Sequence, residues 1–230
     1  MMNRTKDSFK KRKDEVENYF YFLAILNDDE NTRLKYKKDG NLVEDIIPAQ
    51  FQKILIANSF LLLYNVIEAT VRSSILEIYY AIKDNEINFE QLSENLKEIW
   101  IEQSTNNLKQ GNFTSNTLHD CVLDIAESIL TKETISFSEN KLDFSGNLDA
   151  QKIRTIAKQY GFKMPSNGRN LETIKIKRNH LAHGDYTFSQ IGKDFTEKEI
   201  KNFKDETFQF LEDVINKIEQ FIIQERYTQT

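Results

Sequence analysis

The sequence predicts an all-α protein, a helical bundle with one long central helix and extra helices around it. The 230-residue chain contains only two proline and seven glycine residues, so few residues interrupt helices. In several segments the apolar residues recur every three or four positions, as they do on one face of a helix. A chain of this length can bury one substantial core, so we expect residues 1–230 to form a single domain.

The first half of the chain is predicted to form two long helices. One spans residues 8–26, where apolar residues recur at helical spacing. The polar segment 27–47 is expected to be a loop or hairpin insertion, with a turn at Asp39-Gly40. Pro48 suits the first turn of the next helix, residues 48–83. This second helix is apolar around much of its circumference, so we expect it at the centre of the bundle.

Two weaker helices are expected next, at residues 89–103 and 116–130. The second should bury the face that carries Leu118, Val122, Ile125 and Ile129. Residues 131–169 are interpreted as an inserted segment with one short helix, at 148–160, which Gly161 ends. Between residues 131 and 145 the pattern leaves a loop and a short extended piece both open.

The last two helices flank the most informative stretch of the chain. One spans residues 170–182 and stops at Gly184, and the stretch from 185 to 194 is expected to be a turn. Thr196 and Glu199 then form a capping box, which predicts the start of a final helix. An apolar stripe continues along that helix to about Tyr227.

Composition limits the classes of function. A net charge of −5 argues against a protein that coats duplex DNA, because neutralisation of phosphates supplies most of that affinity. The single cysteine, Cys121, excludes an intramolecular disulfide and a cysteine-based zinc site within one chain. Asn65, Glu68 and Arg72 interrupt the most apolar helix, and the N-terminus has no apolar signal region, so we expect a cytoplasmic protein without a membrane span.

The chemistry is concentrated in Arg178-Asn179-His180-Leu181-Ala182-His183-Gly184, which holds two of the three histidines. Arg178 offers a planar fork of N–H donors that suits phosphate. His183 carries an imidazole, which takes up and releases protons near neutral pH. Asn179 lies four residues before His183 and can hydrogen-bond to substrate or orient the imidazole.

These groups suit RNA scission without a metal ion. A base removes the proton of the 2′-hydroxyl, the oxygen attacks the adjacent phosphate, and an acid protonates the leaving oxygen. A guanidinium stabilises the negative charge that develops on the phosphorane. DNA lacks the 2′-hydroxyl and would resist this route.

Helix geometry separates the two side chains, however. Five residues correspond to about 500° of rotation, so Arg178 and His183 lie about 140° apart around the axis of an ideal helix. The site is therefore formed either by a distorted helix end or by two chains. We favour a two-fold dimer, in which two Arg and two His surround one cleft.

Other polar residues leave alternatives open. His180 and His183 could share a metal ion, but no third ligand is evident nearby, so we expect no metal and no cofactor. His180 is expected to be a supporting or surface residue. Glu68 either pairs with Arg72 at helical i,i+4 spacing or reaches the motif helix to orient Arg178 or His183.

The sequence resembles the HEPN superfamily, whose ribonucleases share an Arg-x4–6-His motif in an all-helical dimer. The match is closest to the MAE-type HEPN proteins of bacterial toxin and defence loci. It rests on the motif at residues 178–184, on Leu61-Leu-Leu-Tyr-Asn-Val-Ile-Glu-Ala-Thr-Val-Arg72, on Gly146-Asn-Leu-Asp-Ala150 and on His183-Gly-Asp-Tyr-Thr-Phe188. It covers most of the chain, from about Val16 onward.

The resemblance implies a HEPN-like fold and a function. Arg178 and His183 are the expected catalytic pair, with Asn179, Glu68 and His180 in support. We expect a metal-independent endoribonuclease that acts on RNA as a homodimer. A role as a toxin or defence effector, with an antitoxin or defence-system partner protein, rests on family analogy. Two alternatives stay open: a non-catalytic HEPN module that binds RNA or a nucleotide, and a helical dimerisation domain.

Overall fold

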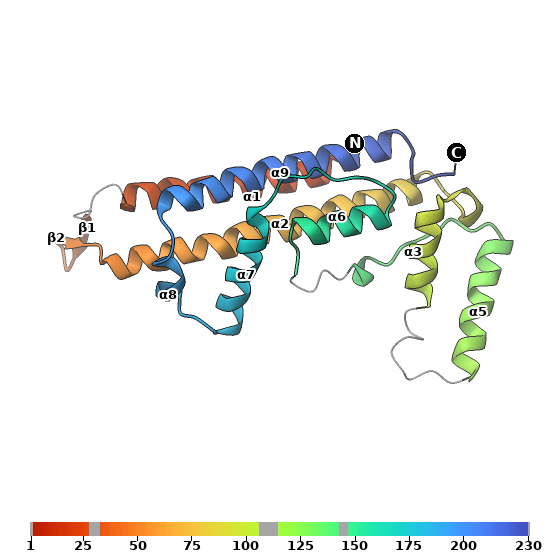
Figure 1. Ribbon diagram of the computed structural model, residues 1–230, viewed down its shortest axis with the longest axis horizontal. Coiled ribbons are helices and arrows are strands. Elements are labelled where there is room, and N and C mark those ends of the chain that lie inside the picture. Colours follow the sequence, from red (N-terminus) through yellow and green to blue (C-terminus); the bar gives the residue numbers. More distant parts are fainter. Residues whose placement is uncertain (1, 28–32, 106–114, 143–146, 230) are drawn as a thin grey trace.

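Three long helices lie side by side along the longest axis of the molecule (Figure 1). They are α1 (Asn3–Asn27), α2 (Ala49–Asp84) and α9 (Glu197–Ile223). α1 runs toward a β-hairpin at one end, and α2 and α9 both run back from it. The structure, a computed structural model, describes residues 2–27, 33–105, 115–142 and 147–229. The predicted helical bundle with a long central helix is confirmed.

Ion pairs hold α1 and α9 in their antiparallel arrangement. Lys6 pairs with Glu219 at 2.6 Å, near the ends of the two helices that lie away from the hairpin. Nearer the hairpin, the ammonium of Lys204 is 2.6 Å from the Glu17 carboxylate, and the Lys204 side chain is almost fully buried. A buried charge needs a partner, so this pair fixes the register between the two helices.

The central helix α2 is unbroken, and Pro48 is its N-cap. Among the described residues it is the one helix whose length and composition would suit a membrane span, with a window of mean hydropathy 1.7. Within the bundle, 56% of that window is buried. α2 packs against α1, α7, α8 and α9, so it is the core helix of the fold.

The polar segment after α1 forms a hairpin of β1 (Arg33–Lys38) and β2 (Asn41–Ile46). Its two turn residues, Asp39 and Gly40, have φ angles of +51° and +82°. Two successive left-handed residues define the turn type that best matches the twist of a hairpin. The hairpin alternative is thereby confirmed; residues 28–32 lie outside the described residues.

The helix expected at residues 89–103 is divided. It begins as a 3₁₀ turn, η1 (Phe89–Gln91), and restarts as α3 (Glu94–Ser104). The C-terminal tail causes the break, because the N–H of Ser93 donates to the carbonyl oxygen of Tyr227 at 2.9 Å. A backbone donor that is engaged outside the helix cannot continue its hydrogen-bond ladder.

The face of α5 (Ser115–Leu130) that the sequence predicts to be buried is only partly covered. Ile125 and Ile129 pack against the core, whereas Leu118 and Val122 are 44% and 56% exposed. The prediction is wrong for these two residues, because α5 contacts little more than α3 and η1. In Figure 1, α3 and α5 project from the end of the bundle that lies away from the hairpin.

The inserted segment contains a short extended piece and a short helix. Thr134 forms an antiparallel bridge with Asn88, and a 3₁₀ turn, η2 (Glu139–Lys141), follows. Residues 143–146, which include Gly146, lie outside the described residues. The helix is α6 (Ala150–Gln159), and Gly161, with φ of +84°, follows its C-cap as predicted.

The motif helix α7 (Asn170–His183) is anchored at its first residue. The backbone N–H and the side-chain amide of Asn170 both donate to the Glu206 carboxylate of α9. The turn before it requires glycine, because Gly168 has φ of +89° and a Cβ there would lie 2.7 Å from Phe210. α7 thus starts on α9 and crosses α2 (Figure 1).

Residues 185–194 were predicted to be a turn. They contain a short helix, α8 (Phe188–Gly192), which we did not predict from the sequence. The signal was present, because Thr187 and Gln190 form a capping box. α8 packs closely on α2: a Cβ at Gly192 would lie 1.8 Å from the carbonyl oxygen of Lys53. This contact fixes the return of the chain after the motif.

Candidate functional site

The motif occupies the last two turns of α7, where the helix extends beyond its crossing with α2 (Figure 1). Gly184 ends the helix in the left-handed conformation, with φ of +75°, as the sequence predicts. After it, the chain turns back toward α2 through α8. The tip of α7 is therefore a projecting corner that two packed helices support.

Arg178 lies on the face of an aromatic ring. The carbon atom of its guanidinium is 4.3 Å from the ring centroid of Tyr64 on α2, and the Arg178 side chain is half-buried. Tyr64 itself is only 2% exposed, so the ring is a fixed platform. A guanidinium held in this way is attracted by the ring and keeps its orientation.

The Tyr64 hydroxyl is also held. Its oxygen accepts a hydrogen bond from the backbone N–H of Leu148 at 3.1 Å. The pKa of Tyr64 is raised above its ordinary value, and burial is the main cause. The negative charges of Glu68 and Asp149 also raise this pKa, whereas the hydrogen bond from the Leu148 N–H and the positive charge of Arg178 lower it. The hydroxyl therefore stays protonated at neutral pH and serves as a neutral anchor.

Asn179 connects Arg178 to the inserted segment. The Nη1 group of Arg178 donates to Oδ1 of Asn179 at 3.0 Å. The Nδ2 group of Asn179 then donates to Oδ1 of Asn147 at 3.3 Å. Asn179 thus orients the guanidinium. From the sequence we expected it either to hydrogen-bond to substrate or to orient the imidazole of His183.

A third tie joins α7 to the start of α6. The ammonium of Lys175 lies 2.5 Å from the Asp149 carboxylate, which also caps α6 by accepting from the N–H of Lys152 at 2.7 Å. Burial raises the pKa of Asp149, but the hydrogen bonds from Lys175 and from the backbone bring it below its ordinary value. The pair is therefore ionic at neutral pH.

His183 is exposed at the tip, and no contact between it and Arg178 occurs among the described residues. The structure thus does not bring the two expected catalytic side chains together within one chain. Arg178 faces Tyr64, and His183 lies on another side of the helix in solvent. Neither side chain is enclosed in apolar packing, so both are accessible to a ligand.

His180 supports the turn after the motif. Its Nδ1 is 3.0 Å from Oδ2 of Asp185, and its ring meets the edge of Tyr186 at a centroid distance of 5.0 Å. In the described part of the chain, no three His, Cys, Asp or Glu side chains are placed as a metal ion would require. These contacts join His180 to the side chains of the two residues that follow Gly184.

Glu68 does not pair with Arg72, and that alternative is wrong. Arg72 donates instead to the carbonyl oxygens of Leu142 and Glu139, at 2.7 and 3.0 Å. These carbonyls lie in the inserted segment. The i,i+4 rule concerns pairs within one helix, so it cannot predict a contact with another segment. Glu68 is half-buried one turn beyond Tyr64, and among the described contacts it makes no hydrogen bond to the motif.

Sequence reasoning missed four residues around Arg178: Tyr64, Asn147, Asp149 and Lys175. One signal was available, because Lys175 lies three residues before Arg178 and therefore on nearly the same face of α7. The other partners come from α2 and from the inserted segment. Their approach to α7 depends on tertiary packing, which no spacing in the sequence reports.

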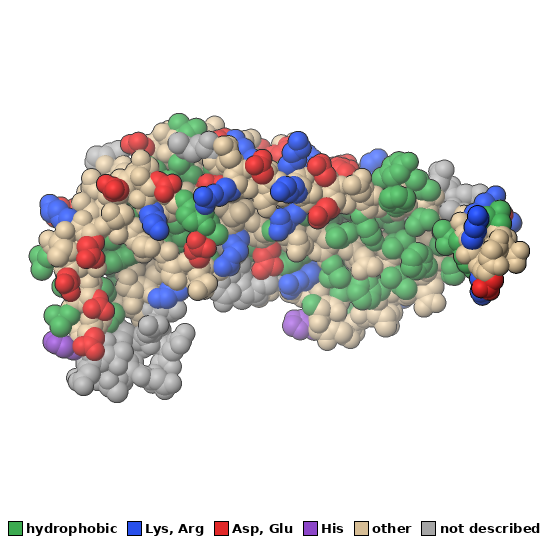
Figure 2. All heavy atoms as spheres, turned by 180° about the vertical axis from the view of Figure 1, so that it is seen from behind, with side chains coloured by type: hydrophobic (Ala, Val, Ile, Leu, Met, Phe, Trp, Pro, Cys, Tyr) green, Lys and Arg blue, Asp and Glu red, His purple; other side chains and the backbone are tan. Residues whose placement is uncertain are grey.

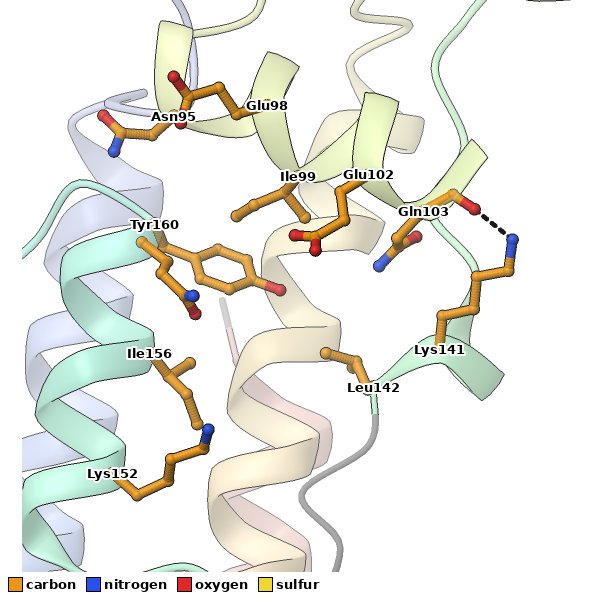
Figure 3. A pocket seen from close by; sticks show the side chains of 11 residues that line it. Asn95, Glu98, Ile99, Glu102, Gln103, Lys141, Leu142, Lys152, Ile156 and Tyr160 are labelled. Carbon is orange, nitrogen blue, oxygen red and sulfur yellow. Dashed lines mark hydrogen bonds between the residues drawn. The ribbon is translucent and has the colours of Figure 1, made fainter. Parts of the chain in front are cut away.

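A separate groove of about 500 Å³ lies between α3 and α6 and contains no motif residue (Figure 3). Its α3 wall carries Glu98 and Glu102, and Lys152 extends from α6. At its edge the ammonium of Lys141 donates to the carbonyl oxygen of Gln103. The groove has the volume of a small-molecule site, but its lining carries charges of both signs and does not include Arg178.

Comparison with known proteins identifies the family. The chain matches the model of the HEPN_MAE_28990-like HEPN family over residues 1–227. No curated protein and no solved structure gave a match. Membership of this family suggests a nuclease or an RNA-related module. The chain belongs to the MAE_28990-like HEPN family.

Proposed function

We propose that this protein is a metal-independent endoribonuclease in which Arg178 and His183 act on one phosphodiester of RNA. The observation that carries the proposal is the state of the α7 tip: a guanidinium fixed on Tyr64 and, on another side of the same helix end, an accessible imidazole. Among contacts with described residues, Nη1 is the one group of Arg178 that donates a hydrogen bond. Its other N–H groups remain available for phosphate oxygens.

In the proposed reaction, an imidazole of His183 takes the proton from the 2′-hydroxyl, and the 2′-oxygen attacks the adjacent phosphorus. Arg178 stabilises the charge that develops on the equatorial oxygens. A second imidazole protonates the 5′-oxygen as its bond to phosphorus breaks. The products are a 2′,3′-cyclic phosphate and a 5′-hydroxyl. No redox change or external nucleophile is required.

The second imidazole comes from a second copy of the chain. Because Arg178 and His183 diverge around one helix, a two-fold pairing of α7 tips supplies the missing partner groups. Exposed apolar side chains near the hairpin end support such pairing, and Figure 2 shows hydrophobic side chains gathered on this half of one face. At this end of α1 and α2, the side chains of Tyr21, Phe22, Ile25 and Phe51 are from 45% to 64% exposed.

The cellular role follows from the family resemblance alone. We place the protein in the cytoplasm, as a toxin or defence effector that an antitoxin or defence-system partner protein controls. The net charge of −5 restricts RNA binding to a local surface. On α7, Lys177 and Arg178 supply positive charge next to the expected cleft.

The test is incubation of the purified protein with RNA in excess EDTA, followed by analysis of the fragment ends. We expect cleavage that leaves 2′,3′-cyclic phosphate ends. Tight RNA binding without cleavage would support the alternative of a binding module and overturn the catalytic proposal. Absence of both binding and cleavage would favour a dimerisation domain. Cleavage that EDTA abolishes would exclude the metal-independent mechanism.

A further inference from the structure

Three consecutive residues of the inserted segment each contact a different group around Arg178. Asn147 accepts from the side chain of Asn179, Leu148 donates its N–H to the Tyr64 hydroxyl, and Asp149 pairs with Lys175. We infer that Asn147-Leu148-Asp149 is a clip that positions the Arg178 guanidinium for catalysis. This inference rests on the proposed function and assigns a positioning role within the same site.

The three contacts restrict different movements of the guanidinium. The Leu148 contact fixes the ring on which it lies, since the Tyr64 hydroxyl is bound to backbone. The Asn147 contact fixes the amide of Asn179, whose oxygen accepts from Nη1. Together they define both the plane of the guanidinium and its rotation within that plane. An arginine side chain has several flexible torsions, so such restriction aligns its fork before substrate arrives.

The clip itself has a rigid base. Leu148 is fully buried in the core, and Asp149 is the N-cap of α6. Farther along α6, Arg154 donates to the carbonyl oxygens of Pro165 and Asn167, in the loop that leads into α7. α6 is therefore tied both to α7 itself and to the loop that precedes α7. The clip is part of a closed structural unit, so it can transmit its position to the motif.

The lysine contact has a second consequence. Lys175 lies one turn before Arg178 on nearly the same face of α7, and its ammonium would repel the guanidinium if it were free. The carboxylate of Asp149 forms an ion pair with this ammonium and neutralises its charge. The clip therefore removes a competing cation from the phosphate site as well as orienting the one that remains.

The test uses full-length protein with the substitutions Asn147→Ala and Asp149→Asn. Asparagine is as good an N-cap as aspartate, so Asp149→Asn removes the charge and keeps the cap. Asn147→Asp retains the acceptor oxygen and serves as the conservative variant. Asn41→Ala, on the exposed hairpin, is the matched control. Thermal unfolding verifies that each variant is folded.

Two readouts separate positioning from folding. The first is the NMR resonance of the Arg178 Nε–H, which the Tyr64 ring current shifts, assigned by its loss in Arg178→Lys. The second is RNA cleavage, resolved into kcat and KM. For Asn147→Ala and Asp149→Asn we expect the resonance to move toward its position in an unstructured chain. We expect kcat to fall about tenfold with KM within about twofold, since alignment in the transition state is lost.

Asn41→Ala should retain the wild-type resonance and rate, and Asn147→Asp, which keeps the acceptor oxygen, should retain the wild-type resonance. An unmoved resonance in both Asn147→Ala and Asp149→Asn would overturn the clip, whatever the cleavage assay shows. A moved resonance with unchanged kcat would overturn its role in catalysis. If the resonance moves but the wild-type protein does not cut RNA, the clip is supported and the proposed function fails.

Discussion

Replacement of His183 by alanine should lower kcat for RNA cleavage by about 10² to 10⁴, because a positioned acid or base contributes that much to proton transfer. Arg178→Ala should cost about 10² to 10³, the usual effect of removing a group that stabilises transition-state charge. Arg178→Lys should not restore the rate, since an ammonium keeps the charge but loses the planar fork. Single-turnover cleavage in EDTA measures all three.

Controls for these substitutions are available on the same chain. His183 is exposed, so its loss should leave the melting temperature unchanged. His119, on the exposed side of α5, is the matched histidine, and His119→Ala should cleave at the wild-type rate. Rates within about threefold of wild type for both His183→Ala and Arg178→Ala would remove these residues from the mechanism.

Gly192→Ala should destabilise the fold strongly, although the position is helical. Helix propensity alone predicts that alanine stabilises a helical position by about 1 kcal/mol relative to glycine. At Gly192, however, the new Cβ would lie 1.8 Å from the Lys53 carbonyl oxygen, which is backbone and cannot rotate away. α8 would have to move off α2, which exposes Ile191. We expect a loss of about 3 kcal/mol or more.

Thermal or denaturant unfolding decides the sign of this effect. A loss of about 3 kcal/mol corresponds to a fall in melting temperature of roughly 6 to 12 °C for a chain of this size. Gly40→Ala is the comparison, because Gly40 has φ of +82° but open space around it, so it should cost about 1 kcal/mol. A Gly192→Ala protein as stable as wild type would show that α8 does not pack on α2 in this way.

Local signals in the sequence predicted most element boundaries. The capping box at Thr196, the left-handed Gly184 and the turn at Asp39-Gly40 all occur where expected. Each of these features depends on residues within four positions of one another, so a linear pattern contains the information. The same kind of signal at Thr187 would have revealed α8.

The predictions from the sequence were wrong where the structure depends on contacts between segments that are far apart in the chain. The break before α3 depends on the C-terminal tail, and the exposure of Val122 depends on how little covers α5. Arg72 bonds to the inserted segment and not to Glu68. In the candidate site the motif on α7 was predictable, but the Tyr64 platform beneath Arg178 was not, because it forms only when α7 crosses α2.

The most direct measurement is activity in a mixed dimer of wild-type and His183→Ala chains, co-expressed with different tags and purified through both. In the proposed reaction one imidazole acts as the base and the imidazole of the second chain acts as the acid in the same cleft, so this mixed dimer lacks one of the two groups. It should therefore cut RNA at least about 10²-fold more slowly than the wild-type dimer. A mixed dimer with about half the wild-type rate, or a chain that does not pair at all, would contradict a shared site.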